Sequence, residues 1–300
     1  MKAAVTKTFN VLLAEPSYDR RSPSPLATPV AIGRIAMYAQ KILQGRVRIT
    51  LVKKIEDFFG SLDKYTFQVA GFGHYVWNAN LSHFLATHLK SLQPQCVIIF
   101  GGPQLPIDPW LQEAYVRQHP QVDFYVEKEG EIPFANLLER LAFHNFAVEP
   151  VKAENVKSVR CVTEQGHFLA ADLEERISAL DEIPSPYLSG IMDIFMAQGF
   201  TPMMVNNRGC PFKCHFCGEG DRHFSRVYAH SKERLVEEFE YIANKMVGHK
   251  QLPFSDHLYF SDSNTGMYKD DLTWGVQKRP FWCSFLVRDL GFVNDFMIVS

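Results

Sequence analysis

Three closely spaced cysteines constrain this chain more than any other feature. Cys210, Cys214 and Cys217 lie in the run RGCPFKCHFC, with the spacing C-x3-C-x2-C. Thiolates at such short intervals are ligands for zinc or for an iron–sulfur cluster, because soft sulfur suits those metals. Three thiolates on a four-iron cube leave one iron without a protein ligand, and an open coordination position is typical of a catalytic metal site. The spacing therefore predicts a metal centre built on one short loop.

Two other interpretations of these cysteines stay open. His215 or His223 could join the three thiolates in a Cys3His zinc site. A structural disulfide fits less well, because six cysteines are few for 300 residues and no secretory signal indicates an oxidising compartment. Cys96 lies in an apolar, strand-like run, where burial alone explains it.

Length and composition bound the remaining possibilities. Three hundred residues predict about two domains, each able to bury its own core. A formal net charge of −2 gives no basic field for nucleic acid and no polybasic patch for a membrane surface. No apolar run reaches the length of a membrane span. We therefore expect a cytoplasmic protein without nucleic-acid or membrane partners.

The first 145 residues alternate between strand-like and helix-like segments. Short apolar runs predict strands at 9–14, 47–52, 66–70, 96–100 and 122–126. Apolar residues at helical spacing predict helices at 30–43, 78–92 and 134–141, the first of them capped by Thr28 and Pro29. This alternation predicts an α/β domain with a flavodoxin-like (Rossmann-type) parallel sheet covered by helices on both faces.

In such sheets, ligands bind beyond the carboxyl ends of the strands. The loops expected at that edge are 15–18, 71–74, 101–103 and 127–131. Their glycines would let a bulky ligand approach the backbone, although a glycine after a strand is also ordinary turn chemistry. His74 lies on one of these loops, where we expect an exposed histidine. A side chain at Gly102 is expected to clash with a bound ligand while the fold survives.

Residues 146–200 are predicted to link this domain to a second one. Glu164-Gln-Gly166 indicates a hairpin-like turn within 156–170. The segment 180–187 contains Pro184 and Pro186, which exclude a helix and predict a rigid, extended linker.

Residues 201–300 are predicted to begin a (β/α) barrel. Residues 201–207 would form its first strand and deliver the cysteine loop at the carboxyl end, where barrel enzymes keep their chemistry. Ser231 is predicted to cap a helix, and 257–260 to form a second strand followed by Asp262. Residues 281–287 fit one more strand, but 272–300 show no clear helix for a third unit. We therefore expect an incomplete barrel, as in a fragment, a truncated product or a divergent protein.

Together these motifs resemble the radical S-adenosylmethionine (SAM) proteins that carry a cobalamin (B12)-binding domain. The cysteine spacing in an Arg-Gly-Cys-Pro-Phe context, with Phe216 before the third cysteine, is similar to the radical SAM signature. Pro16, Gly101-Gly102-Pro103 and Gly130-Glu131 are similar to the loops of the cobalamin-binding domain, and 181–186 to its linker. The D-x-H-x-x-G motif of base-off/His-on cobalamin domains is absent, which leaves the lower cobalt ligand unassigned.

The resemblance implies a radical SAM enzyme, with a barrel that is incomplete within this chain. Cys210, Cys214 and Cys217 would hold a [4Fe-4S] cluster, and Asp262 would contact the amino group of SAM. The residues implied to contact cobalamin are Gly101, Gly102, Pro103, Gly130 and Glu131. The enzyme would generate a 5′-deoxyadenosyl radical and transfer a methyl group from cobalamin to an unactivated carbon of a small-molecule substrate. An electron donor such as flavodoxin or ferredoxin would reduce the cluster.

Two other functions share much of this pattern. A cobalamin-independent radical SAM cyclase or rearrangement enzyme would carry the same motifs. A non-catalytic Cys3His zinc-binding protein would share the fold and lack the radical chemistry. Iron and labile-sulfide analysis separates the zinc-binding protein from both enzymes.

Overall fold

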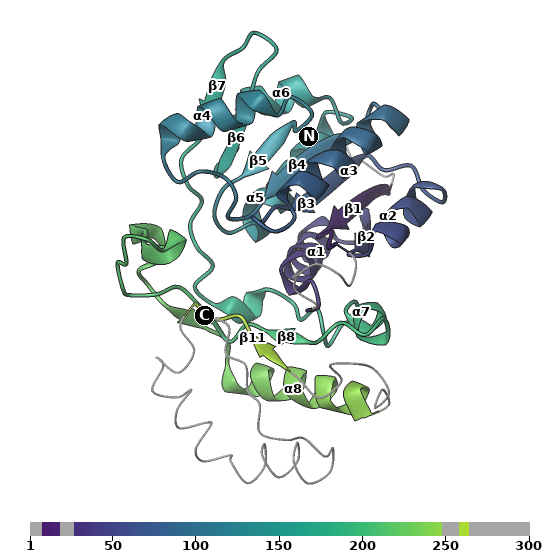
Figure 1. Ribbon diagram of the computed structural model, residues 1–300, viewed down its shortest axis with the longest axis vertical. Coiled ribbons are helices and arrows are strands. Elements are labelled where there is room, and N and C mark those ends of the chain that lie inside the picture. The colour runs from purple at the N-terminus through teal and green to yellow at the C-terminus, as the bar shows by residue number, and fades with distance from the viewer. Residues whose placement is uncertain (1–7, 19–26, 248–257, 264–300) are drawn as a thin grey trace. The chain divides into compact units, whose positions relative to one another are not determined.

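The computed structural model of this protein describes residues 8–18, 27–247 and 258–263. Its contacts divide the chain into two compact units (Figure 1). In the described residues, the first unit comprises 8–18 and 31–176, and the second comprises 27–30, 177–247 and 258–263. Residues 27–30 therefore belong to the second unit, although both flanking segments belong to the first. The predicted division at residues 145 and 200 stays a prediction.

A seven-stranded sheet forms the centre of the first unit, with the order β2-β1-β3-β4-β5-β6-β7. Its strands are β1 (Phe9–Ala14), β2 (Val47–Val52), β3 (Val69–Gly73), β4 (Val97–Gly101), β5 (Phe124–Val126), β6 (Val159–Val162) and β7 (Phe168–Ala170). The first five are parallel, and the hairpin of β6 and β7 adds two antiparallel strands at one edge. The 2-1-3-4-5 order of the parallel strands is that of flavodoxin-like folds, which confirms the predicted fold class.

Helices cover both faces of this sheet. They are α1 (Val30–Leu43), α2 (Ile55–Leu62), α3 (Ala79–Leu92), α4 (Pro109–Gln118), α5 (Glu131–Phe143) and α6 (Val148–Ala153). On one face, Leu12 of β1 packs in a buried cluster with Phe58 of α2 and Leu85 of α3. On the other face, Leu13 of β1 approaches Phe134 of α5 above Gly71. Alternate residues of β1 therefore face opposite helical layers, as the period of two in a strand requires.

The third strand differs from its prediction. We expected a strand at 66–70 followed by a glycine loop at 71–74, but Gly71, Phe72 and Gly73 form the last three residues of β3. A Cβ atom at Gly71 would stand 2.5 Å from Leu13 Cδ2 and 3.1 Å from Phe134 Cε2. Gly71 thus lies in the strand because two side chains pack directly against its backbone.

The second unit contains short strands around one long helix. Its elements are η1 (Leu180–Glu182), α7 (Asp193–Ala197), β8 (Met203–Met204), β9 (Asn207–Arg208), η2 (Gly218–Gly220), η3 (Arg222–Phe224), β10 (Tyr228–Ala229), α8 (Lys232–Val247) and β11 (Tyr259–Phe260). β8 pairs in parallel with β11, and α8 lies between them in the sequence. Ser231 Oγ accepts a hydrogen bond from the Arg234 amide at 3.2 Å, as expected of a helix cap. The predicted strand at 281–287 lies outside the described residues.

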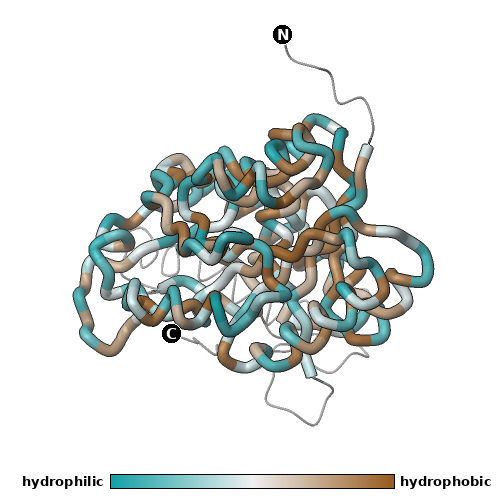
Figure 2. The backbone as a smooth tube through the Cα atoms, turned by 90° about the horizontal axis from the view of Figure 1, so that it is seen from above, coloured by the Kyte–Doolittle hydropathy of each residue, from teal (hydrophilic) through white to brown (hydrophobic). Residues whose placement is uncertain are grey.

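Hydrophilic and hydrophobic residues alternate along much of the chain, as Figure 2 shows by colour. This alternation is the expected pattern for helices and strands that bury one side only. Among the described residues, none of the helices is both long and apolar enough to cross a membrane.

Candidate functional site

The three predicted cysteines lie on a single loop of the second unit. This loop, residues 209–227, connects β9 to β10, and these strands pair in antiparallel fashion with Arg208 opposite Tyr228. Cys210 is half-buried, and its amide donates to the Phe224 carbonyl at 2.9 Å. Cys214 and Cys217 are exposed, and the Cys217 amide donates to the Cys214 carbonyl at 3.1 Å. The backbone therefore folds the three cysteines into one compact turn.

Two glycines permit this turn. Gly209 has a φ of +103°, a conformation that side chains rarely adopt. Gly220 lies directly against Cys214, because a Cβ atom at this position would stand 2.3 Å from the Cys214 carbonyl oxygen. By contrast, a Cβ atom at Gly218 would have no neighbour within 4 Å.

The cysteines of the described chain fall into two chemical classes. Cys96 and Cys161 are buried, and burial raises the pKa of Cys96 to about 12 and that of Cys161 to about 11. Both therefore stay protonated and are poor metal ligands. Cys210, Cys214 and Cys217 form no disulfide, and Cys210 is half-buried while the other two are exposed. In residues 8–18, 27–247 and 258–263, no three Cys, His, Asp or Glu side chains gather closely enough to hold a metal ion.

The aromatic and histidine side chains near the cysteines are mostly exposed to solvent. Phe216 is 94% exposed and Phe212 is 56% exposed. His215 is exposed, whereas His223 is half-buried, and its amide donates to Asp221 Oδ1 at 2.8 Å.

Asp262 contacts the segment that leads into the cysteine loop. It is buried and follows β11. Its Oδ1 accepts from the Asn206 amide at 2.6 Å and from the Asn207 amide at 3.1 Å, and its Oδ2 accepts from Asn206 Nδ2 at 2.9 Å. Sequence reasoning selected Asp262 for its position after a strand and could not see this partner. Its predicted contact with SAM stays a prediction.

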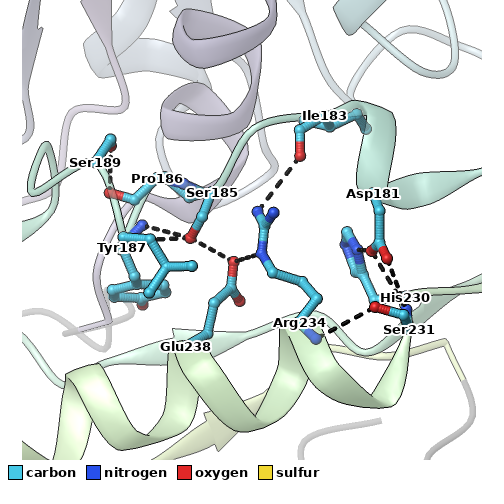
Figure 3. Close-up of polar contacts among 11 residues, drawn as sticks. Asp181, Ile183, Ser185, Pro186, Tyr187, Ser189, His230, Ser231, Arg234 and Glu238 are labelled. Atoms are coloured by element: carbon cyan, nitrogen blue, oxygen red, sulfur yellow. Dashed lines mark hydrogen bonds and ion pairs between the residues drawn. The ribbon is translucent and has the colours of Figure 1, made fainter.

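Asp181 contacts His230 and Ser231, which directly follow β10, as Figure 3 shows. Its Oδ1 lies 2.7 Å from His230 Nδ1, and its Oδ2 accepts from the Ser231 amide at 3.2 Å. Burial raises the pKa of Asp181, but hydrogen bonds from Ser231 and His230 lower it by more, so the net pKa lies below the ordinary value.

The proline-containing segment after Asp181 binds along α8. Ser185 Oγ donates to Glu238 Oε1 at 2.6 Å, and Arg234 Nε donates to the same oxygen at 2.8 Å (Figure 3). Tyr187 is fully buried, and its hydroxyl donates to the Met203 carbonyl at 2.7 Å. The segment predicted as a linker thus fixes β8 and α8 within the second unit.

A second group of candidates lies at the carboxyl edge of the first unit's sheet. Gly101 ends β4, and a Cβ atom there would make an ordinary contact with Val126 at 3.7 Å. Gly102 has a φ of +129°, and its Cβ atom would stand 2.5 Å from the His74 carbonyl oxygen. Pro103 is exposed. Gly102 is therefore required by the protein's own packing, and the expectation that the fold would tolerate a side chain there is wrong.

Acidic residues of the loop after β5 are directed into ion pairs with arginines. Glu131 pairs with Arg34 of α1, with Nε 3.7 Å from Oε1 and both side chains buried. Glu129 pairs with Arg176 at 3.0 Å, and Glu127 pairs with Arg160 of β6. A Cβ atom at Gly130 would stand 3.0 Å from Ile35 Cδ1. These pairs fix the loop from three separate segments, a role that the sequence motif did not reveal.

His74 is buried, so the expectation of an exposed loop histidine is wrong. Its Nδ1 lies 2.8 Å from Tyr125 Oη, and its ring packs against Phe100 and His83. Burial first, and then His83 and His119, lower the pKa of His74 to about 3. The imidazole is therefore neutral near pH 7.

Exposed apolar side chains are the main feature of this edge that sequence reasoning missed. Tyr75 and Trp77 stack with ring centroids 4.5 Å apart. The large apolar residues exposed on the loops that follow β1, β3 and β4 are Tyr18, Val76, Trp77 and Ile107. The carboxylate of Glu15, at the same edge, forms an ion pair with Lys53, whose Nζ lies 2.7 Å from Glu15 Oε1. The edge thus offers apolar surface and internally paired charges, which suits a large ligand with an apolar face.

The chain is similar in sequence to known methyltransferases and similar in fold to solved radical SAM enzymes. No protein-family model matches the chain. It is 35% identical over 205 residues to 2-(S-pantetheinyl)-carbapenam-3-carboxylate methyltransferase of Streptantibioticus cattleyicolor, an alignment that covers 66% of this chain and 28% of the relative. It is 32% identical over 206 residues to the cobalamin-dependent radical SAM methyltransferase TokK of Streptomyces tokunonensis, with the same two coverages. The chain is a homologue of cobalamin-dependent radical SAM methyltransferases. It spans little more than a quarter of the length of these two relatives.

Solved structures of radical SAM enzymes have the same fold. The cobalamin-dependent SAM radical enzyme OxsB superposes with a TM-score of 0.68 at 19% identity, over 91% of this chain and 37% of OxsB. The radical SAM methyltransferase TsrM of Kitasatospora setae superposes with a TM-score of 0.63 at 13% identity, over 91% of this chain and 51% of TsrM. These likenesses confirm the predicted combination of a Rossmann-type sheet with barrel elements.

Proposed function

We propose that this protein is a cobalamin-dependent radical SAM methyltransferase acting on a small molecule. The proposal rests on the combination of two features in one chain, a sheet and a cysteine loop. A flavodoxin-like sheet is followed by a loop with three cysteines that form no disulfide, and this loop begins directly after β9, a few residues beyond the parallel strand β8. The homology to TokK supports the same activity.

Cys210, Cys214 and Cys217 would hold a [4Fe-4S] cluster. Their donor chemistry fits this group, because three cysteines lie within eight residues on one loop and no described cysteine forms a disulfide. Gly209 and Gly220 permit the tight backbone turn of this loop, within which the three thiols would converge on a bound cluster. When bound, the cluster would supply the electron that cleaves SAM to a 5′-deoxyadenosyl radical, after reduction by a donor such as flavodoxin or ferredoxin.

Cobalamin would bind at the carboxyl edge of the first sheet. Gly101 ends β4 at this edge, Gly102, Pro103 and Gly130 lie on its loops, and the exposed Trp77 and its neighbours suit the apolar face of a corrin. Because the Glu131 carboxylate faces Arg34, any contribution of Glu131 would come through its backbone. His74 is buried against Tyr125, which is consistent with the absence of the D-x-H-x-x-G motif.

Anaerobic reconstitution tests the cluster. We expect about four irons and four sulfides per chain, because three thiolates and one open iron suit a cubane cluster. Cys214→Ala should abolish the charge-transfer absorbance, whereas Cys96→Ala should leave it unchanged, since Cys96 is buried in the other unit. Stoichiometric zinc without sulfide would reject the proposal in favour of a zinc-binding protein.

Retention of hydroxocobalamin after desalting tests the second cofactor. Gly102 is unsuitable for this test, because a side chain there collides with His74 whether or not a ligand binds. Trp77→Ala should instead reduce retention, because it removes exposed aromatic surface from the proposed edge. Phe143→Ala is the control, since Phe143 is also an exposed aromatic residue but ends α5, the helix that begins at the carboxyl edge and runs away from it. If wild type retains no corrinoid but carries the iron–sulfur cluster, a cobalamin-independent radical SAM enzyme becomes the better proposal.

A further inference from the structure

The base of the cysteine loop has little backbone pairing of its own. β9 and β10 contribute two residues each, and their register pairs Asn207 with Ala229 and Arg208 with Tyr228. A two-stranded ladder of this length is marginal by itself. Other contacts must therefore hold the two ends of the loop in place.

Asp262 supplies the first of these contacts. Its buried carboxylate accepts both the Asn206 and the Asn207 amides, and it also accepts the Asn206 side-chain amide. Bonds from amides to a carboxylate are stronger than those between neutral groups. Asp262 follows β11, which pairs with β8, so it ties the loop's first end to the two parallel strands of the unit.

Asp181 supplies the second contact at the other end of the loop. It binds His230 Nδ1 and the Ser231 amide, as Figure 3 shows. The His230 amide in turn donates to the Asn206 carbonyl at 2.9 Å. Asn206 thus connects the two carboxylates. Its backbone and side-chain amides donate to Asp262, and its carbonyl accepts from His230, which Asp181 binds.

We propose that Asp262, acting through Asn206 and Asn207, is a positioning residue for the cysteine loop, and that Asp181 assists it through His230. The two carboxylates hold the ends of the loop at a fixed separation, and this separation sets the approach of the three thiols to one another. The proposal rests on the proposed function, because it assigns the loop a cluster to position.

Hydrogen exchange on the 300-residue protein tests the proposal without a bound cluster. Asp262→Asn keeps the shape of the side chain but removes its charge and one acceptor. We expect the Asn206 and Asn207 amides to exchange about tenfold faster or more, since the oxygen that accepts both bonds loses its charge and the bonds weaken. Asp181→Asn should speed exchange at His230 and Ser231, and it provides a second variant at a more exposed position.

Asp193→Asn is the matched control. Asp193 is another acidic residue of the second unit, and it accepts from Tyr241 Oη at 2.8 Å and from Lys245 Nζ at 2.5 Å. These contacts join α7 to α8 and do not involve the loop base. Its replacement should leave the exchange of Asn206 and Asn207 as in wild type.

The reconstituted protein gives a readout that a merely structural role would not move. Removing the negative charge of Asp262 near the loop should raise the reduction potential of the cluster and alter its paramagnetic spectrum. Unchanged exchange at Asn206 and Asn207 in Asp262→Asn would overturn the proposal, and so would weaker SAM binding in equilibrium dialysis without faster exchange. If wild type loads no iron and sulfide, the proposed function fails, while the exchange rates still decide whether Asp262 holds the loop.

Discussion

At the scale of single residues, Gly220 and Gly218 form a natural pair for testing the cysteine loop. A methyl group at Gly220 would overlap the Cys214 carbonyl at 2.3 Å, whereas one at Gly218 would meet nothing within 4 Å. We expect Gly220→Ala to displace Cys214 and to lower iron per chain after reconstitution. Gly218→Ala should load as wild type does. Equal loading of the two variants would show that the loop tolerates movement at Cys214.

Because His74 is buried as a neutral imidazole, we expect the free energy of unfolding to depend on pH. Burial, followed by His83 and His119, lowers the pKa of His74 to about 3, and burial followed by His119 lowers the pKa of His83 to about 4. Below the ordinary histidine pKa of about 6.5, the unfolded chain binds protons that these folded imidazoles do not. The stabilising contribution is therefore complete above about pH 6.5 and falls as the pH drops from there toward 4.

Urea denaturation at pH 7.5 and at pH 5.0 measures this effect. We expect the midpoint to be lower at pH 5.0, and His74→Gln to reduce the difference between the two pH values. Replacement of the exposed His167 by Gln serves as the control and should keep the wild-type difference. An unchanged pH dependence in His74→Gln would contradict the burial of a neutral imidazole.

At the scale of elements, α5 carries a buried and an exposed ion pair on one helix. Glu131 pairs with Arg34 at 3.7 Å with both side chains buried, and Glu139 pairs with Arg46 at 3.2 Å with both exposed. Burial, and not distance, decides their effects, because removing one partner of a buried pair leaves a desolvated charge. We expect Glu131→Gln to lower the free energy of unfolding by about 3 kcal/mol. Glu139→Gln should lower it by about 0–1 kcal/mol, as chemical denaturation of both variants would measure.

At the scale of the whole molecule, residues 27–30 belong to the second unit, although the other residues of that unit lie far away in the sequence. Ala27 forms a parallel bridge with Thr201, and the Thr28 amide donates to the Thr201 carbonyl at 2.8 Å. Thr28 Oγ1 lies 2.8 Å from Tyr187 Oη and accepts from the Met203 amide at 3.1 Å. The hydroxyl that we predicted as a helix cap therefore serves β8.

Thr28→Val tests this connection. The variant leaves the Met203 amide with one acceptor fewer and the Tyr187 hydroxyl with one donor fewer, which costs about 1–3 kcal/mol. We expect faster hydrogen exchange at Met203 and unchanged exchange in β4 of the first unit. Thr50→Val in β2 is the control, and it should not affect Met203. Identical exchange in both variants would separate residues 27–30 from the second unit.

The sequence by itself determined the features that depend on local patterns. The bounds of β1 and β2, the hairpin of β6 and β7 and the Ser231 cap follow from periodicity and turn chemistry, which act over a few residues. The spacing of Cys210, Cys214 and Cys217 likewise belongs to one short loop, so the candidate metal ligands could be named without a structure.

Only the tertiary structure decided which partners the remaining residues have. Glu131 meets an arginine almost a hundred positions away, Gly71 and Gly102 are required by neighbouring elements, and His74 is buried beneath a tyrosine of another strand. Asp262 stood out in the sequence as a polar residue after a strand, yet its contacts with Asn206 and Asn207 arise from the pairing of β11 with β8. Such contacts join residues far apart in the chain, so they cannot be predicted from the periodicity of one segment.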